Sequence, residues 1–237
     1  MPRTLVVLPL YNEAPTVDRV LREVQRWAQG CDVLVVDDGS TDGSAEILKA
    51  YVDVTVLTHR ENEGYGQSLI DGFAYAAAHG YDVVVTLDCD EQHEPHQIPQ
   101  FVAALAGADI VSGSRYLDPA VGGDPAPPDR RQLNEEITAR LRALTGYPLT
   151  DAFCGFKAYR VEALRRLRLS EPSYGLPLQV WVQAAHHGLR VRELATARIY
   201  KNPARRFWGG LDDPEVRRRY YHEVIDREVK RWPVSSP

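Results

Sequence analysis

The feature that most constrains this chain is an alternation of short apolar runs with helix-period patterns in its first half. The apolar runs are residues 4–8, 33–36, 54–57, 82–87 and 109–112. Helix-period patterns lie between them at residues 14–28, 44–51, 67–78 and 98–105. Strands that are apolar on both faces and separated by amphipathic helices are typical of parallel sheets covered by helices. The alternation therefore predicts an α/β fold with a Rossmann-like, mostly parallel sheet and helices on both faces.

Polar or glycine-containing clusters follow each of these apolar runs. They are Tyr11–Glu13, Asp37–Ser40, Asn62–Gly64, Asp88–Gln92 and Gly113–Arg115. Sheets of this kind bind ligands at the carboxyl ends of their strands, which meet at one edge. We therefore expect the clusters to form one site.

Asp88 and Asp90 flank Cys89 directly after a buried strand. Two carboxylates with this spacing at a strand end can converge on one hard cation, and Mg²⁺ or Mn²⁺ prefers such oxygen ligands shared with substrate phosphates. Gln92 adds a neutral polar group beside them. An Asp-x-Asp pair alone is common in solvated acidic loops, and it gains weight here from the neighbouring clusters.

The segment from Asp37 to Asp42 carries a second candidate for nucleotide binding. Asp38 is placed to accept hydrogen bonds from the base or ribose of a nucleotide, and Gly39 permits close approach of the backbone. The alternative is a helix cap, in which Ser40 or Asp42 begins the next helix.

Composition narrows the function classes. The chain has 237 residues, and its net charge of −5 argues against a general nucleic-acid binder. From Arg190 onward, 12 Lys/Arg stand against 7 Asp/Glu, a local charge of +5 that suits an anionic ligand, an anionic membrane or a solvated helix face. No phosphate-loop motif and no Gly-x-Gly-x-x-Gly after the first strand is present, which disfavours P-loop NTPases and nicotinamide dehydrogenases.

Cysteine usage and apolar run length bear on the compartment. Three widely spaced cysteines without a Cys-x-x-Cys pair fit a reducing compartment, and the chain enters a strand pattern with no signal peptide. No apolar run approaches the roughly 20 residues that span a bilayer. We expect a cytoplasmic protein that meets any lipid substrate from the membrane surface.

The second half is more mixed. Residues 117–130 are rich in Pro, Gly and Asp and predict a mobile loop near the site. We expect helices at 133–144 and 176–187, a short strand at 155–159 and an extended segment at 190–200. Asp213 and Pro214 have the pattern of a helix start. The predicted organisation is one catalytic domain, 1–212, followed by an amphipathic helix and tail, 213–237.

Six sequence pieces together resemble the family-2 glycosyltransferases of the GT-A fold, and most closely the dolichol-phosphate (polyprenyl-phosphate) mannosyltransferase group. The pieces cover about residues 5–160. They are Leu8–Glu13, Val36–Asp42, Asn62–Gly66, Leu87–His93, Gly113–Tyr116 and Asp151–Lys157.

The resemblance implies a role for individual residues. It implies a nucleotide-sugar site at Pro9, Tyr11, Glu13, Val36, Asp38, Cys89, Gln92 and Arg115. It implies that Asp88, Asp90 and Gln92 hold a Mg²⁺ or Mn²⁺ ion, and that Asp88, Asp90, Arg115 and Asp151 serve catalysis, Asp151 on the acceptor side. Lys201, Arg205 and Arg206 loosely match the phosphate-binding end of the family pattern.

Two stretches depart from the group. Gln179 is present where a Gln-x-Glu is usual, but Trp181 replaces the glutamate, and residues 207–213 differ from the usual ending. Both departures lie on the acceptor side. The donor-phosphate side follows the family pattern throughout.

The function implied is inverting transfer of a hexose, mannose or glucose, from a GDP- or UDP-sugar to a polyprenyl- or dolichyl-phosphate acceptor. A phosphate acceptor is already anionic and needs orientation and charge shielding rather than a base. The alternative is a family-2 transferase with a UDP-sugar and a hydroxyl acceptor, for which Asp151 is the candidate base. A non-catalytic nucleotide-binding module is a further alternative.

The C-terminal helix, residues 214–231, carries basic side chains around an apolar stripe. This pattern fits peripheral contact of residues 214–237 with an anionic membrane. It equally fits packing against the catalytic domain or against the partner in a homodimer.

Overall fold

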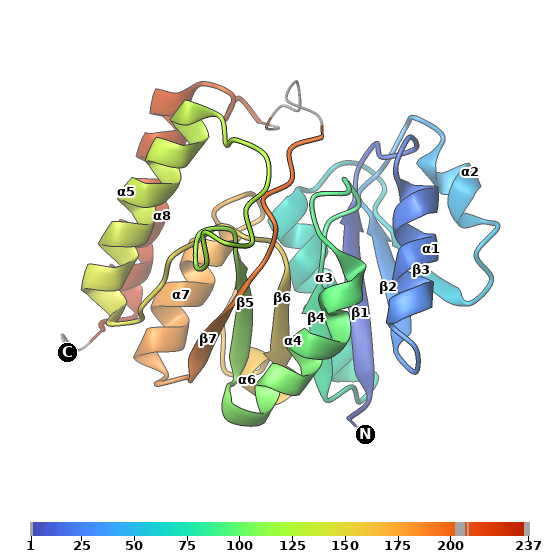
Figure 1. Cartoon of the computed structure of the whole chain (residues 1–237), viewed down its shortest axis with the longest axis horizontal. Coiled ribbons are helices and arrows are strands. Elements are labelled where there is room, and N and C mark those ends of the chain that lie inside the picture. Colours follow the sequence, from blue (N-terminus) through green and yellow to red (C-terminus); the bar gives the residue numbers. More distant parts are fainter. Residues whose placement is uncertain (1, 202–206, 208, 235–237) are drawn as a thin grey trace.

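Seven strands form one sheet in the computed structural model, in the order β3-β2-β1-β4-β6-β5-β7 (Figure 1). The structure describes residues 2–201, 207 and 209–234. The strands are β1 (Thr4–Leu10), β2 (Asp32–Asp37), β3 (Val54–Thr58), β4 (Val83–Thr86), β5 (Ile110–Ser114), β6 (Lys157–Arg160) and β7 (Val191–Ala195). The mostly parallel sheet that the sequence predicts is confirmed.

Helices cover both faces of this sheet (Figure 1). The α-helices are α1 (Val17–Trp27), α2 (Ser44–Leu48), α3 (Tyr65–Ala78), α4 (Ile98–Ala104), α5 (Pro128–Thr145), α6 (Val161–Leu164), α7 (Leu176–His186) and α8 (Pro214–Arg231). Two short 3₁₀ helices, η1 (Pro95–Gln97) and η2 (Leu105–Gly107), flank α4. One apolar core joins α1 and α4 to the sheet, and the other joins α3, α5, α7 and α8 to its opposite face.

β6 is the antiparallel member of the sheet. It lies between β4 and β5 and pairs antiparallel with both, with Thr86 opposite Lys157 and Val111 opposite Ala158. The Thr86 hydroxyl donates a 2.7 Å hydrogen bond to the carbonyl of Gly155. This insertion carries the segment that precedes β6 to the end of β4, directly beside Asp88.

Two differences from the sequence expectations concern the segments around the predicted site. α5 begins at Pro128, so the last residues of the predicted loop form its first turn. α2 begins after Gly43, whose φ of 95° is left-handed, so neither Ser40 nor Asp42 occupies the N-cap position itself. Asp42 stands one residue earlier, and its Oδ1 accepts a 3.0 Å hydrogen bond from the Ser44 amide at the start of the helix. The Ser40 hydroxyl instead accepts a hydrogen bond from the Asn12 amide, which ties the first two polar clusters together.

α8 packs its apolar side against α5 and α7. Asp213 caps it, accepting hydrogen bonds from the amides of Glu215 and Val216, as the sequence predicts. At its far end the buried Glu228 carboxylate accepts hydrogen bonds from Gln179 and Gln183 of α7. Packing against α5 and α7 therefore accounts for the apolar stripe. Among the described residues, no helix has the length and apolar character to cross a membrane.

Close approach of α3 to β1 leads to a stability prediction. A Cβ at Gly72 would lie 2.5 Å from a methyl group of Val7, whereas a Cβ at Gly107 would meet no atom within 4 Å. We expect Gly72→Ala to lower the free energy of unfolding by about 1–3 kcal/mol through overpacking. Gly107→Ala, the matched control, should change it by less than about 0.5 kcal/mol. Urea denaturation measures both, and equal values for the two variants would contradict the packing described.

Candidate functional site

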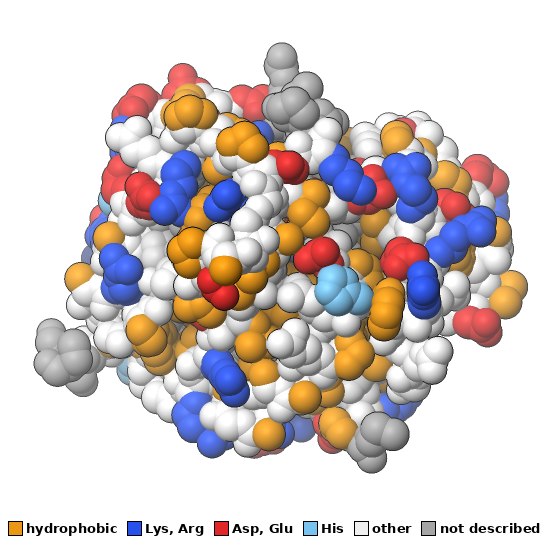
Figure 2. Space-filling view, in the orientation of Figure 1, with side chains coloured by type: hydrophobic (Ala, Val, Ile, Leu, Met, Phe, Trp, Pro, Cys, Tyr) orange, Lys and Arg blue, Asp and Glu red, His pale blue; other side chains and the backbone are white. Residues whose placement is uncertain are grey.

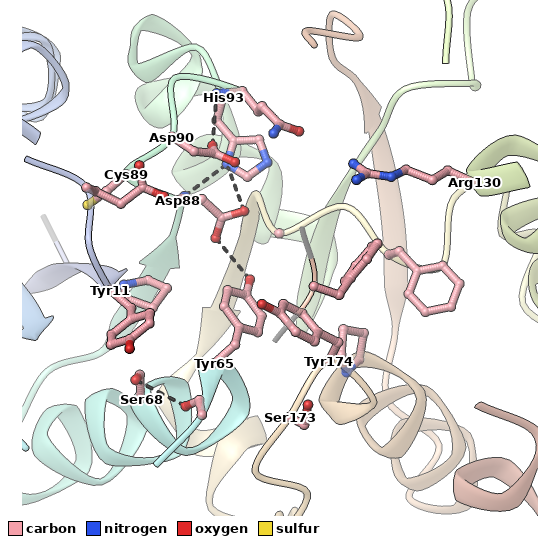
Figure 3. A pocket seen from close by; sticks show the side chains of 18 of the residues that line it. Tyr11, Tyr65, Ser68, Asp88, Cys89, Asp90, His93, Arg130, Ser173 and Tyr174 are labelled. Atoms are coloured by element: carbon pink, nitrogen blue, oxygen red, sulfur yellow. Dashed lines mark hydrogen bonds and ion pairs between the residues drawn. The ribbon is translucent and has the colours of Figure 1, made fainter. Parts of the chain in front are cut away.

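A cavity of about 470 Å³ lies at the carboxyl edge of the parallel strands. All five polar clusters contribute to its lining, as the strand pattern predicts. The predicted residues that line it are Pro9, Tyr11, Glu13, Asp38, Asp88, Cys89, Asp90, Gln92 and Arg115. Figure 3 shows Asp88 between Tyr65 and His93, with Arg130 on the opposite side of the cavity.

Asp88 is held by two neighbours. The Tyr65 hydroxyl donates a 3.0 Å hydrogen bond to Oδ1 of Asp88. The backbone amide of Asp88 donates a 3.0 Å hydrogen bond to Nδ1 of the His93 ring. Burial, and then the charge of Asp88, raises the pKa of Tyr65 well above its usual value, so the phenol stays a neutral donor. These contacts hold the carboxylate toward the cavity.

Gly155 leaves no room for a side chain beside Asp88. A Cβ there would lie 2.7 Å from the Asp88 carboxylate and 2.9 Å from the Tyr65 hydroxyl. The backbone before β6 therefore forms the floor under this carboxylate. Any larger residue at position 155 would displace it.

The turn that carries Asp90 contains a strained residue, Glu91. Glu91 has a left-handed φ of 61°, which costs a non-glycine residue about 1–2 kcal/mol. Its carboxylate is held by Arg19 at 2.8 Å and by Lys201 at 3.4 Å. The Gln92 amide donates a 3.0 Å hydrogen bond to Asp90. These contacts fix the turn that presents Asp90 and Gln92 to the cavity.

Asp38 belongs to a buried network at the carboxyl edge of the sheet. Its Oδ1 lies 2.7 Å from His59 Nδ1 and accepts from the Glu63 amide at 2.7 Å, and its Oδ2 accepts from the Gly64 amide at 2.9 Å. The His59 Nε2 lies 3.1 Å from Asp71. Burial alone would lower the pKa of His59, but its hydrogen bond to Asp38 and the nearby carboxylates outweigh it and raise the pKa. A carboxylate has about four acceptor positions, so these three contacts leave Asp38, which lines the cavity, with one more.

Arg115 and Asp151 form a buried ion pair at the other end of the cavity. Arg115 Nε lies 2.6 Å and its Nη2 2.9 Å from the two Asp151 oxygens, a bidentate arrangement. Asn134 also donates to Asp151, at 2.8 Å. Burial would raise the pKa of Asp151, but Arg115 and these hydrogen bonds lower it to about 2. Asp151 lies behind Arg115 and outside the cavity lining.

The wall opposite the aspartates is apolar and aromatic, which the sequence did not predict. It is formed by Leu133, Phe153, Tyr174, Pro177, Phe207 and Tyr221. Tyr174 stacks on Tyr65 with 5.7 Å between ring centroids, and Phe153 packs on Tyr221 at 4.7 Å. These residues come from segments far apart in the chain, so no local pattern marks them. Two further lining residues were not predicted as site residues. Tyr65 lies within the Asn62–Gly66 piece of the family pattern, and Arg130 lies at the end of the predicted loop.

Trp181 lies in the core and does not line the cavity. It is fully buried, and its indole N–H donates a 2.9 Å hydrogen bond to the Ala152 carbonyl. The ammonium group of the buried Lys157 lies 5.5 Å from the centre of its ring. Burial lowers the pKa of Lys157. The departure from the family pattern at position 181 therefore changes the packing under residues 151–157, not the cavity lining.

Besides Asp151, four predicted site residues lie outside the cavity lining or are not described. Val36 is buried in the core of β2, and Lys201 pairs with Glu91; neither is among the lining residues. Arg205 and Arg206 lie outside the described residues. Their roles stay predictions. Within the described part of the chain, no group of three or more His, Cys, Asp or Glu side chains is arranged to hold a metal ion.

The buried ion pair of Arg115 and Asp151 leads to a prediction for the stability of the fold. Asp151→Asn leaves the Arg115 guanidinium without its charge partner, and breaking a buried pair in this way costs about 3–5 kcal/mol. We expect urea denaturation at neutral pH to show a loss on that scale. Because the folded pKa of Asp151, about 2, lies below its ordinary value, its stabilisation is present above pH 4 and is lost as the pH falls toward 2.

The control is Asp109→Asn, which removes the carboxylate of the exposed Arg190 pair. Exposed pairs contribute about 0–1 kcal/mol. The wild type should lose stability below pH 4 more steeply than Asp151→Asn does. A common pH slope for the two proteins would contradict the assigned pair.

The family model described as Glycosyl transferase family 2 matches residues 5–168. Among curated relatives, the undecaprenyl-phosphate mannosyltransferase of Micrococcus luteus is 33% identical, over 81% of this chain and 82% of its own length. The polyprenol monophosphomannose synthase of Mycolicibacterium smegmatis is 32% identical, over 81% of this chain and 76% of its own.

Among solved structures, glucosyl-3-phosphoglycerate synthase from Mycobacterium tuberculosis, in complex with Mn²⁺, uridine diphosphate and glucosyl-3-phosphoglycerate, superposes with a TM-score of 0.73. The identity is 22%, and the match covers 99% of this chain and 81% of that one. This similarity shows the fold, which is the expected GT-A fold.

Proposed function

The chain belongs to glycosyl transferase family 2, and from this premise we propose that it transfers a hexose from a nucleotide-diphosphate sugar to a polyprenyl-phosphate acceptor, with inversion at the anomeric carbon. The names of the two curated relatives support the lipid-phosphate acceptor. The observation that carries the proposal is the charge arrangement of the cavity, in which Asp88 and Asp90 lie across from Arg130 (Figure 3).

The carboxylate end fits the donor diphosphate and a divalent ion. Mg²⁺ is usually bound by one or two carboxylates together with substrate phosphates, so Asp88 and Asp90 suffice as protein ligands, with Gln92 beside them. When bound, Mg²⁺ or Mn²⁺ supplies positive charge that neutralises the leaving diphosphate. Tyr65 and His93 hold Asp88 in place, and the remaining acceptor position of Asp38 suits an N–H or O–H of the nucleoside.

The guanidinium end fits an anionic acceptor. A phosphate monoester is already charged near neutral pH, so its oxygen attacks without a general base and needs only orientation and charge shielding. Arg130 lines the cavity and supplies that shielding. Arg115, whose charge is balanced by Asp151, lines it too and can orient the phosphate through its N–H groups. Asp151 is unsuited as a base for a hydroxyl acceptor, because it is paired with Arg115 and its pKa is about 2. It acts instead by positioning Arg115.

The aromatic wall suits the hydrocarbon part of the acceptor. Phe153, Tyr174 and Tyr221 line the cavity on the side of α7 and α8. Apolar groups of an acceptor that enter here leave water, at about 25 cal/mol for each Å² buried. We place the first isoprene units at this wall and the enzyme at the cytoplasmic face of the membrane that carries the lipid.

Loss of either aspartate should abolish transfer. We expect Asp88→Asn and Asp90→Asn to lower kcat by more than about 100-fold, the scale on which electrostatic contacts to developing charge act. Thermal denaturation should show folded proteins. Glu94→Gln is the control, because Glu94 is a nearby acid that does not line the cavity. Turnover within a few-fold of wild type in either aspartate variant would rule out this diphosphate site.

The donor and acceptor are identified by two measurements. Thermal shifts with GDP- and UDP-hexoses, each with Mg²⁺ or Mn²⁺, should single out one donor, because a ligand at 100 times its Kd stabilises by about 2.7 kcal/mol. Product analysis should then show transfer to undecaprenyl phosphate and none to free sugars. Transfer to a sugar hydroxyl alone would replace the proposed acceptor. A donor that stabilises the protein without transfer or hydrolysis would indicate a nucleotide-binding module.

A further inference from the structure

A second cavity, of about 360 Å³, adjoins the first and shares Arg115 and Tyr116 with it. We call it the arginine pocket. Its other lining residues are Asp118, Pro119, Gly122, Ala126, Arg131 and Arg198. They come from the loop after β5, the first turn of α5 and the segment after β7. The proposed transfer reaction assigns no role to Arg131 or Arg198.

Three guanidinium groups surround the ring of Tyr116. The guanidinium carbon of Arg131 lies 3.8 Å from the ring centroid, that of Arg198 5.6 Å and that of Arg115 5.7 Å. An aromatic face attracts such cations but does not neutralise them. Tyr116 therefore gathers three positive charges around one small cavity and leaves their net charge available.

The carboxylates nearby compensate these charges unequally. Arg115 is neutralised by the buried Asp151. Arg131 pairs with Glu135, whose side chain is 57% exposed, so this pair is weak and exchangeable. Arg198 donates from Nε to the Asp124 carbonyl at 2.6 Å, and no carboxylate of the described residues lies within 4 Å of its guanidinium.

Asp118 is the acidic residue in the pocket lining. Its Oδ1 accepts a 2.8 Å hydrogen bond from the Ala120 amide and thereby shapes the loop. Once Asp151 has balanced Arg115, the lining keeps Arg131 and Arg198 against Asp118, and Glu135 offsets Arg131 only through an exposed pair. On the face drawn in Figure 2, Lys and Arg side chains are scattered among acidic ones.

The loop that roofs the pocket is fastened to the segment after β7. The Asp124 amide donates to the Arg198 carbonyl at 2.6 Å, and the Arg198 amide donates to the Gly122 carbonyl at 3.2 Å. Gly123 has a φ of 121°, and a Cβ there would lie 2.2 Å from the Arg198 carbonyl oxygen. Only glycine permits this contact, so the pocket is built before any ligand binds.

Two aliphatic side chains of the same loop face solvent. Leu117 and Val121 are each 42% exposed, among the few large apolar side chains of the described residues that are. Aliphatic side chains beside a cationic pocket are the combination that a membrane surface accommodates, with phosphates at the charges and hydrocarbon at the apolar groups.

We propose that the arginine pocket binds a phosphate-class oxyanion, held by Arg131 and Arg198. Guanidinium groups suit this ligand because their planar N–H pairs match the spacing of phosphate oxygens. The source is either a phospholipid headgroup or free phosphate, and Leu117 and Val121 favour the headgroup. The inference goes beyond the proposed reaction, which assigns no role to Arg131 or Arg198. It also places membrane contact at the loop after β5 and not at the stripe of α8.

The test measures binding without any sugar donor or acceptor. Flotation with vesicles of phosphatidylcholine and phosphatidylglycerol compares wild type, Arg131→Gln, Arg198→Gln and their combination. A basic residue near an anionic surface is worth about a five-fold change in partitioning, so we expect about five-fold weaker binding for each single variant. Arg22→Gln is the matched control, because Arg22 is a 72% exposed arginine on α1. It should bind like wild type.

A second arm uses inorganic phosphate alone and follows the thermal shift that it causes. Leu117→Ser/Val121→Ser should weaken vesicle binding and leave the phosphate shift intact, which supports the headgroup. Loss of the phosphate shift in the arginine variants, with unchanged vesicle binding, assigns the pocket to free phosphate. Vesicle binding and phosphate shifts both equal to those of Arg22→Gln would overturn the proposal. Each outcome is independent of transferase activity.

Discussion

The buried pair of Arg115 and Asp151 is the interaction on which the candidate site depends. It joins the end of β5 to the segment that precedes β6, and Asn134 of α5 donates to the same carboxylate. Because a buried charge must be paired and hydrogen-bonded, this contact tolerates little displacement. It holds one guanidinium group at the cavity and, through the following residues, keeps Gly155 under Asp88.

The two ends of the cavity follow from this arrangement. After β4, Asp88 and Asp90 present negative charge for a cation and a diphosphate, and Arg130 presents positive charge on the opposite side. The proposed reaction joins two anions, a donor diphosphate and an acceptor phosphate. Each anion needs positive charge of its own nearby to offset its negative charge. Tyr116 and Arg115 then form the boundary with the arginine pocket, so donor, acceptor and the proposed membrane contact occupy neighbouring parts of one face.

Sequence patterns predicted most of the residues at the donor end of the cavity and few of those at the acceptor end. The acidic and polar clusters follow strands with continuous apolar runs, and the rule that parallel strands end at one edge is enough to bring them together. The aromatic wall has no such local signal, because Phe153, Tyr174 and Tyr221 meet only when α7 and α8 pack beside the sheet. Trp181 departs from the family pattern but lies in the core, which only its burial and its hydrogen bond to Ala152 reveal.

The sequence by itself determined the α/β class, the polar edge of the sheet and the place of Asp88 and Asp90 on it, because strand and helix periodicities are local properties of the chain. The tertiary structure alone decided that β6 enters the sheet antiparallel and that Asp151 pairs with Arg115 instead of facing the cavity. It also decided that α8 packs on α5 and α7, and that Arg131 and Arg198 meet at Tyr116. Each of these depends on contacts between segments distant in sequence, whose pairing is set by the packing of the whole molecule and not by any local pattern.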